Sequence, residues 1–333
     1  MTRLMRQLLS RLKTPLKFTL VLALLFFLSQ KGLLSLEKTG RAFLQWKVML
    51  PAILTLFFTT FLSFARWKLL LSAQGIQITW SRLLQLSMIG AFFNIALPGA
   101  VSGDVVKAIY VGKEIGGQRA RAFGSILFDR VAGVGALVMV CAASFTLGIH
   151  EFSNSLILSG TRVFVVAAAL GVVTFFGYIF VVKEMHDPFL RALRALEKRL
   201  PRLEAIRRVY EGLRHYHHHK KVVLQTLAIS MIIHLLVGWV FSQFAIALGL
   251  TDLSLRSIYI AAPLGLLVTA IPVAPGGMGT GNLAFAVLFN MLGTTHGADL
   301  YTMFALVNIF IGLSGGVSYL RFKEKGELAQ LSQ

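Results

Sequence analysis

Asp104, Lys107, Asp129 and Arg130 are ionisable residues in apolar stretches of this chain that could bind a ligand. Asp104 and Lys107 are three residues apart, so they can pair on one face of a helix. Asp129 and Arg130 are adjacent, and adjacent side chains on a helix point about 100° apart, so both cannot face one partner. We expect Asp129 to pair with a base elsewhere and Arg130 to face a cavity. Charges in apolar surroundings are costly unless paired or wet, so Arg130 is a candidate anion-binding residue.

The Asp104–Lys107 pair follows a break in the apolar segment 82–112. The polar and helix-breaking residues of this break are Asn94, Pro98, Gly99, Ser102 and Gly103. Ser102 can cap a new helix that begins at Gly103. The amino end of that helix would carry free N–H groups and a partial positive charge, which suit a phosphate or another anion. The alternatives are a cap with a structural ion pair, and an Arg130 that extends to the membrane surface.

A second break, within 257–293, is richer in glycine. Its Pro and Gly residues and the polar residue after them are Pro272, Pro275, Gly276, Gly277, Gly279, Gly281 and Asn282. Glycine lets a ligand or another backbone approach closely, which makes this stretch a second candidate part of a binding site. Thr280 or Asn282 can cap the helix that follows. A tight structural kink is the alternative, and the lack of a P-loop lysine argues against a nucleotide site.

The two breaks are informative because they interrupt membrane-type segments. Pro and Gly free backbone N–H and C=O groups, which lipid cannot satisfy, so such a break must be buried in protein or line a wet cavity. A matched pair of broken segments in the two halves of a chain points to a substrate site.

Composition identifies the class of protein. Of 333 residues, 56% are hydrophobic and 14% charged, and the mean hydropathy of +0.72 is that of an integral membrane protein. The net charge of +19 comes from bases between the apolar runs, which orient a membrane protein and attract anionic lipid headgroups rather than nucleic acid. The single cysteine, Cys141, forms no disulfide within the chain, and the run His215–His219 lacks the partners of a metal site. No cofactor is expected.

The hydropathy pattern predicts an all-α polytopic membrane protein forming a single domain over 1–333. Six segments are long enough to span a bilayer: 15–35, 48–68, 123–148, 161–182, 222–249 and 300–320. The broken segments 82–112 and 257–293 have arms too short for a full crossing, so we expect two re-entrant hairpins. Each hairpin lies between two spans, which predicts an inverted repeat whose hairpins enter from opposite sides and meet near the midplane.

Charge distribution predicts the orientation. The basic segment 184–220 and both termini are expected in the cytoplasm, and the loop 149–160 outside. The basic loop between Lys31 and Lys47 must then be external, against the usual bias. Apolar residues spaced by three and four predict that 184–220 is an amphipathic helix, interrupted at Pro201, on the cytoplasmic leaflet. In the span 222–249, His234 is expected to be a hydrogen-bonded packing residue rather than a proton relay.

The ordered motifs resemble a known family. They are Asn94, Pro98-Gly99, Gly103-Asp104 and Lys107, then Asp129-Arg130, then Pro275-Gly276-Gly277 with Gly279. This string, over about residues 10–322, resembles the flippase-like transmembrane family that includes the membrane region of lysylphosphatidylglycerol synthases. The family usually has an acidic residue where this chain has Asn282, and Glu is frequent in place of Asp129. The aminoacyl-transferase domain of full synthases would follow this region, so that enzyme activity is not expected in a chain ending at Gln333.

The resemblance implies lipid translocation. We expect an anionic, aminoacylated or carrier-linked lipid to move between the leaflets of a bacterial inner membrane. Arg130, Lys107 and the half-helix amino ends would bind its phosphate, and Asp104 and Asp129 would orient those bases. Two alternatives stay open, a membrane-embedded lipid-modifying enzyme and a non-transporting accessory protein for a lipid-synthesis enzyme. A homo-oligomer is also possible on sequence grounds.

Overall fold

Within its described part, the computed structural model has five helices long and apolar enough to cross a membrane. They are Trp46–Ala73, Ala120–Thr146, Arg162–Val181, Glu204–Ala247 and Gly297–Arg321. These five confirm five of the six predicted spans, while the first, 15–35, lies largely outside the described residues. The structure describes residues 25–96, 102–114, 119–148, 156–183, 186–197, 199–200, 203–269 and 277–331. All regular elements in those ranges are helices.

The first half of the chain places a helical hairpin between two long helices. α3 (Trp46–Ala73) precedes α4 (Trp80–Ala96) and α5 (Ser102–Glu114), which pack on each other, and α6 (Arg119–Gly148) follows. At 1.5 Å per residue, the 17-residue α4 and the 13-residue α5 are about 26 Å and 20 Å long. Both fall short of the roughly 30 Å of a hydrocarbon core. The predicted hairpin is confirmed as two short arms around a break.

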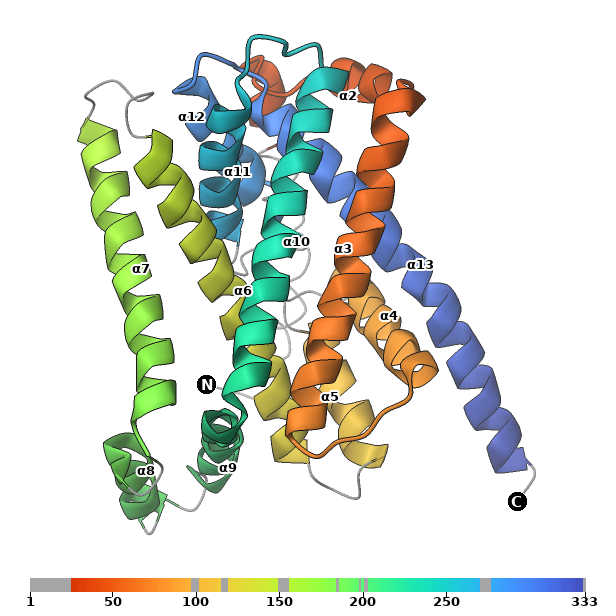
Figure 1. The fold of residues 1–333 in the computed structure, drawn as a ribbon. Coiled ribbons are helices and arrows are strands. Elements are labelled where there is room, and N and C mark those ends of the chain that lie inside the picture. Colours follow the sequence, from red (N-terminus) through yellow and green to blue (C-terminus); the bar gives the residue numbers. More distant parts are fainter. Residues whose placement is uncertain are drawn as a thin grey trace, which may run out of the picture.

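The second half repeats this order. α10 (Lys220–Ala247) precedes the short α11 (Leu255–Thr269) and α12 (Thr280–Asn290), and α13 (Gly297–Leu331) follows. The α11–α12 hairpin lies at one end of the molecule and the α4–α5 hairpin toward the other (Figure 1).

The two halves are related by an exchange of contacts. α3 packs along α10. The first arm of each hairpin packs on the last helix of the other half, α4 on α13 and α11 on α6. The second arm packs on the last helix of its own half, α5 on α6 and α12 on α13. Such reciprocal packing fits the predicted inverted repeat. The hairpin tips, 97–101 and 270–276, lie outside the described residues. The prediction that the two hairpins meet concerns these tips and stays a prediction.

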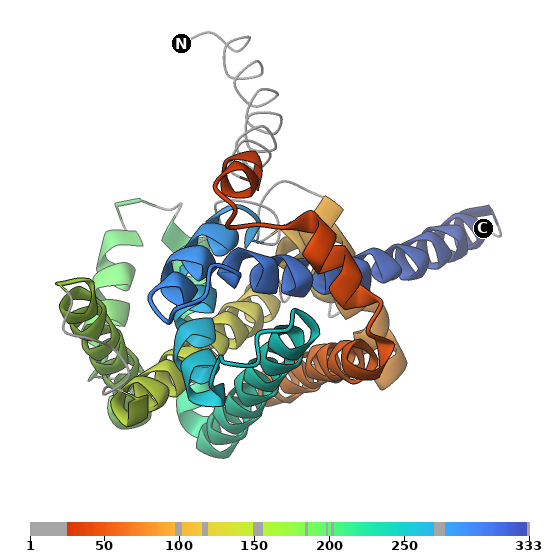
Figure 2. The ribbon, with the colours of Figure 1, turned by 90° about the horizontal axis from the view of Figure 1, so that it is seen from above.

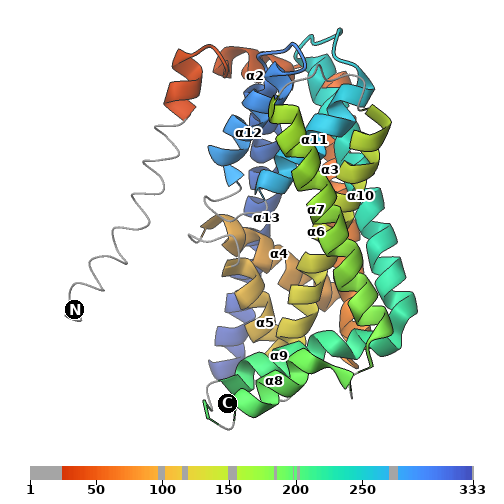
Figure 3. The same ribbon diagram turned by 90° about the vertical axis from the view of Figure 1, so that its left-hand side faces the viewer.

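Shorter helices flank this bundle. α2 (Leu36–Phe43) lies at the end that holds α11 and α12, whereas α8 (Pro188–Glu197) and α9 (Glu204–Arg214) lie at the opposite end (Figure 3). α7 (Leu156–Val181) stands at the rim beside α6 (Figure 2). The amphipathic segment is therefore two helices, and Pro201, where an interruption is predicted, lies outside the described residues. A short 3₁₀ helix, His215–His219, joins α9 to α10.

Asp187 fixes the corner between α7, α8 and α9. Its carboxylate is fully buried and accepts hydrogen bonds from the hydroxyls of Tyr178, at 2.7 Å, and Tyr210, at 2.9 Å. Arg214 Nε lies 2.9 Å away as an ion pair. Burial alone would raise the pKa of Asp187, but the N–H of Leu190, the two hydroxyls and the guanidinium together hold that pKa below its ordinary value.

Candidate functional site

Asp129 pairs with Arg66 of α3. Arg66 donates from Nε to Asp129 Oδ1 at 2.7 Å and from Nη2 to Oδ2 at 2.9 Å, which is the two-pronged geometry of a strong Arg–carboxylate pair. Its third donor, Nη1, bonds Ser230 Oγ of α10 at 2.8 Å. The two charged side chains are 10% and 15% exposed. This pair confirms that Asp129 binds a base elsewhere, and it ties α3, α6 and α10 together.

Asp104 holds two cations at once. Arg130 Nε donates to Asp104 Oδ2 at 2.7 Å, and Lys107 Nζ forms an ion pair with Oδ1 at 3.0 Å. The pairing of Asp104 with Lys107, expected from their spacing, is confirmed. Lys107 Nζ also lies 5.0 Å from the ring centroid of Trp67, a cation–π contact. The Arg130 side chain is 54% exposed, and its Nη atoms have no hydrogen-bond partner among the described residues.

The amino end of α5 is packed tightly against α4. The N–H of Gly103 donates to Asn94 Oδ1 at 2.9 Å, so one free donor of this helix end is already satisfied. A Cβ at Gly103 would lie 1.8 Å from the carbonyl oxygen of Gly90, which explains why glycine stands there. α5 begins at Ser102, one residue before the predicted start. Pro98 and Gly99 lie outside the described residues.

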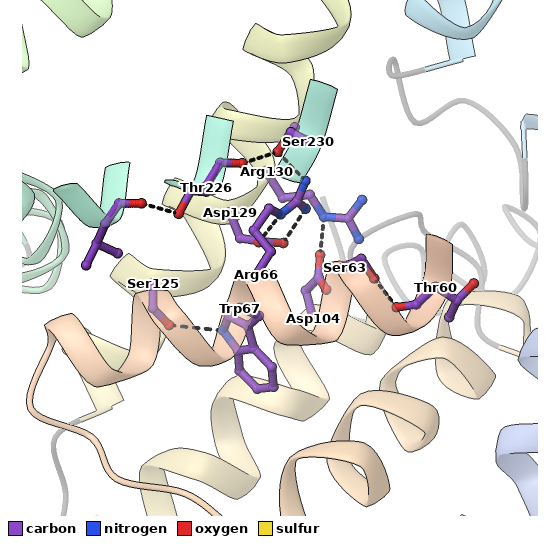
Figure 4. A network of polar contacts seen from close by, with 12 residues as sticks. Thr60, Ser63, Arg66, Trp67, Asp104, Ser125, Asp129, Arg130, Thr226 and Ser230 are labelled. Atoms are coloured by element: carbon purple, nitrogen blue, oxygen red, sulfur yellow. Dashed lines mark hydrogen bonds and ion pairs between the residues drawn. The ribbon is translucent and has the colours of Figure 1, made fainter. Parts of the chain in front are cut away.

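The charges of this group do not balance. Arg66, Lys107 and Arg130 carry three positive charges, and Asp104 and Asp129 carry two negative ones. Arg66 and Asp129 neutralise each other, so the surplus belongs to Asp104 and its two cations. In Figure 4 the terminal nitrogens of Arg130 point away from the Arg66–Asp129 pair. An unbalanced cation with free donors is a candidate binding site for an anionic group.

The second hairpin makes a different set of contacts. Gly277 and Gly279 have φ of +67° and +81°, and a Cβ at Gly281 would lie 2.2 Å from the ring of Tyr301 in α13. Asn282 is buried, and its Oδ1 accepts the N–H of Gly279 at 2.9 Å, which caps α12 as predicted. These glycines serve a tight turn packed on α13.

Asn282 is also committed to α13. Its Nδ2 donates to Thr302 Oγ1 at 2.7 Å and to the carbonyl of Ala298 at 3.1 Å. Within the described residues no hydrogen bond or ion pair joins the second hairpin to Asp104 or Arg130. Pro275 and Gly276 lie outside the described residues. The structure thus brings together the candidates of the first hairpin and of α6, and it places Gly277, Gly279 and Asn282 elsewhere.

Sequence reasoning missed Arg66. The signal was present, because Arg66 is a base within the span 48–68, and ionisable groups inside membranes mark functional sites by default. His234 fulfils the packing role expected of it, with Nε2 hydrogen-bonded to the carbonyl of Gly133 at 3.0 Å. The rings of His215 and His217 likewise bond backbone carbonyls, of Ala73 and Ile179.

Comparison with known proteins agrees with the motifs. The family described as the lysylphosphatidylglycerol synthase TM region matches residues 15–313. The chain belongs to this family. The UPF0104 membrane protein PH1989 of Pyrococcus horikoshii is 24% identical over 300 residues, covering 83% of this chain and 85% of that protein. No solved structure matches.

Family membership establishes an integral membrane protein with a lipid-related function. The matched residues include both hairpins, Arg66 and the Asp129–Arg130 dipeptide. The match is to the membrane region alone and shows no catalytic domain.

Proposed function

We propose that this protein moves a lipid with a phosphate-bearing headgroup between the two leaflets of the membrane. The observation that carries the proposal is the surplus positive charge of the cluster formed by Asp104, Lys107 and Arg130. This cluster lies where α5 begins, beside the tip of a helical hairpin whose arms are too short to cross a bilayer. A cation in such a place is costly unless it meets an anion or water. A lipid phosphate supplies the anion, while the acyl chains stay in the surrounding lipid.

Each residue has a distinct part in this scheme. Asp104 takes the Nε of Arg130, so the two Nη groups are turned outward as a fork. A planar fork grips two phosphate oxygens at once, which a lysine ammonium does not do. Lys107 lies on the other oxygen of Asp104 and adds attraction without leaving the cluster. The Arg66–Asp129 pair, one residue along α6, holds that helix in register with α3.

The surplus positive charge also ranks the candidate lipids by the charge of their headgroups. Among anionic, aminoacylated and carrier-linked lipids, those with a net negative headgroup complement a surplus cation best. An aminoacylated headgroup that carries a net positive charge is repelled by the same surplus. We therefore infer that anionic and phosphate-linked lipids are the preferred substrates.

The proposed setting is a cytoplasmic membrane, with α8 and α9 on the cytoplasmic side. Both helices carry bases, and apolar side chains on them are exposed, namely Phe189, Leu196 and Ile206. An amphipathic helix of this kind lies in the headgroup region, where its bases attract anionic lipids. In that orientation the first hairpin opens to the cytoplasm.

The test is lipid movement by purified protein. Vesicles that contain the protein and a trace of fluorescent-tailed phosphatidylglycerol are treated with an impermeant quencher, which reports the fraction of label reaching the outer leaflet. We expect wild-type protein to move the label and Arg130→Gln to lose about 10- to 100-fold in rate, as for a charged hydrogen bond worth about 1.5–3 kcal/mol. Arg130→Lys should lose much of the rate as well.

The matched control is Arg41→Gln. Arg41 is 76% exposed in a surface pair with Glu37 on α2, so its loss should leave lipid movement unchanged. Vesicles in which wild-type protein moves no labelled lipid, or in which Arg130→Gln moves it at the wild-type rate, would overturn the proposal.

A further inference from the structure

An apolar groove runs between α6 and α7 with Arg130 at one end. Its volume is about 470 Å³, which is within the usual range of small-molecule sites. Besides Arg130, its lining includes Val134, Val138, Phe164, Ala168, Phe175 and Leu267. From Arg130 to Val138 the groove follows α6 for about 12 Å, at 1.5 Å per residue. It is therefore elongated and apolar, with a charge at one end.

The groove exists because α7 is loosely attached. The window of α7 that spans the membrane is 17% buried, the lowest value among the five candidate spans of the described residues. α7 stands at the rim of the bundle, with α6 as its main neighbour (Figure 2). The two helices touch closely at Gly135, where an added Cβ would lie 2.9 Å from Phe176 Cε2. Elsewhere they leave the groove open toward the surroundings of α7, which in a membrane are lipid tails.

We propose that this groove holds one acyl chain of an anionic phospholipid whose phosphate is bound by Arg130. The inference rests on the proposed function and adds the path by which the lipid reaches the site, laterally between α6 and α7. Charge complementarity selects the occupant. Arg130 is the one charged residue in the lining, and its Nη atoms have no hydrogen-bond partner in the described part of the chain, so an apolar helix would leave that cation unmatched.

The position of Leu267 connects the groove to the second hairpin. Leu267 lies near the carboxyl end of α11, two residues before Thr269, where that arm ends. A lipid in the groove thus touches α6 through Arg130, whose hydrogen-bond partner Asp104 belongs to the first hairpin, and it touches the second hairpin through Leu267. The bound lipid then contacts the second hairpin directly and is connected to the first hairpin through the hydrogen bond from Arg130 to Asp104.

Two glycines of α7 allow a matched test. Gly171 lines the groove, and a Cβ added there meets no atom within 4 Å, so Gly171→Leu adds a side chain to the groove at a position with room for its Cβ. Gly177, on the same helix, also has open space around its Cβ but is not part of the lining. Gly177→Leu therefore makes the same change in volume and helix propensity away from the groove.

The experiment uses phosphatidylglycerol with a photoactivatable diazirine on one acyl chain, in vesicles with full-length protein, and maps photoproducts by peptide mass spectrometry. We expect photoproducts concentrated on α6 between 130 and 138 and on α7 between 164 and 176. Gly171→Leu should reduce them about tenfold, the effect of losing a few buried methylenes, while Gly177→Leu leaves them unchanged. Ala168→Leu is the second blocking variant. Arg130→Gln should reduce them with the anionic probe.

The outcomes separate this inference from the proposed function. Wild-type protein that moves lipid but gives photoproducts spread evenly over its surface overturns the groove and leaves the proposed function standing. Labelling confined to the groove and lost in Gly171→Leu supports the groove even where no lipid movement is seen. Photoproducts unchanged in both blocking variants would show that no acyl chain occupies the groove.

Discussion

Asp104 is the residue at which the charge balance is decided, because it holds Lys107 and Arg130 together. One carboxylate neutralises one cation, so the second keeps its charge and its free donors. The three-residue spacing in the sequence predicted the pair of Asp104 with Lys107. It did not predict Arg130 on the same carboxylate, because that contact depends on how α5 packs against α6 in space.

The partner of Asp129 shows the same limit at the residue scale. The adjacency of Asp129 and Arg130 predicted that the carboxylate binds a base elsewhere. The identity of that base depends on how α3 packs against α6. Arg66 and Asp129 are 63 positions apart, and a single sequence does not reveal how two distant helices align. Arg66 was nevertheless visible as an isolated base within a span.

Breaking the Arg66–Asp129 pair should destabilise the protein. Each side chain is at most 15% exposed, so Arg66→Gln and Asp129→Asn each leave a buried charge without its partner, at a cost of about 3 kcal/mol. The double variant leaves no unpaired charge and should lose much less than the sum of the two. Thermal unfolding in detergent measures this, with Arg41→Gln as the exposed control. Additive losses in the double variant would contradict a direct pair.

At the scale of elements, the second hairpin depends on glycine packed against one aromatic ring. A Cβ at Gly281 would lie 2.2 Å from Tyr301, so Gly281→Ala should cost about 1–3 kcal/mol through overpacking. Gly177→Ala, in open space on α7, should instead stabilise by about 0.5–1 kcal/mol. Unfolding temperatures of the two variants provide the comparison. Equal effects would mean that α12 and α13 are not packed in this way.

Asp187 should make the corner of α7, α8 and α9 sensitive to acid. Its pKa is lowered on folding, so its contribution to stability is complete above the unfolded pKa of about 3.9 and is lost as pH falls through the lower folded value. The stability difference between wild type and Asp187→Asn should then be constant from pH 5 to 8, a range of about three units, and shrink in stronger acid. Unfolding followed against pH measures it. A difference that grows on acidification would contradict the assigned direction.

The elements themselves were largely predictable. Long apolar runs predicted the spans, and clustered Pro and Gly residues predicted both hairpins, whereas the single prolines Pro51 and Pro263 lie inside α3 and α11. The role of the second hairpin was harder to predict from the sequence. Its glycines are equally suited to a ligand and to a close side chain, and only the position of Tyr301 in the fold shows that a side chain fills the space.

At the scale of the whole molecule, the inverted repeat predicts opposite sidedness for its two ends. Asp252, between α10 and α11, and Lys220, at the start of α10, are exposed at opposite ends of that helix. Single cysteines there, in a Cys141→Ala background, should react with an impermeant thiol reagent from outside and from the cytoplasm, respectively. Labelling of intact and opened cells provides the measurement. Reaction of both from one side would rule out this topology.

The most direct test of the proposed function is the charge selectivity of lipid movement. In vesicles that carry labelled phosphatidylglycerol or labelled phosphatidylcholine, the wild-type protein should move the anionic lipid faster. In the double variant Lys107→Gln with Arg130→Gln, which removes both cations from Asp104, that preference should disappear, with the anionic rate falling about tenfold or more. Equal rates for the two lipids in wild type, or a preference that survives the double variant, would contradict a surplus cation as the basis of function.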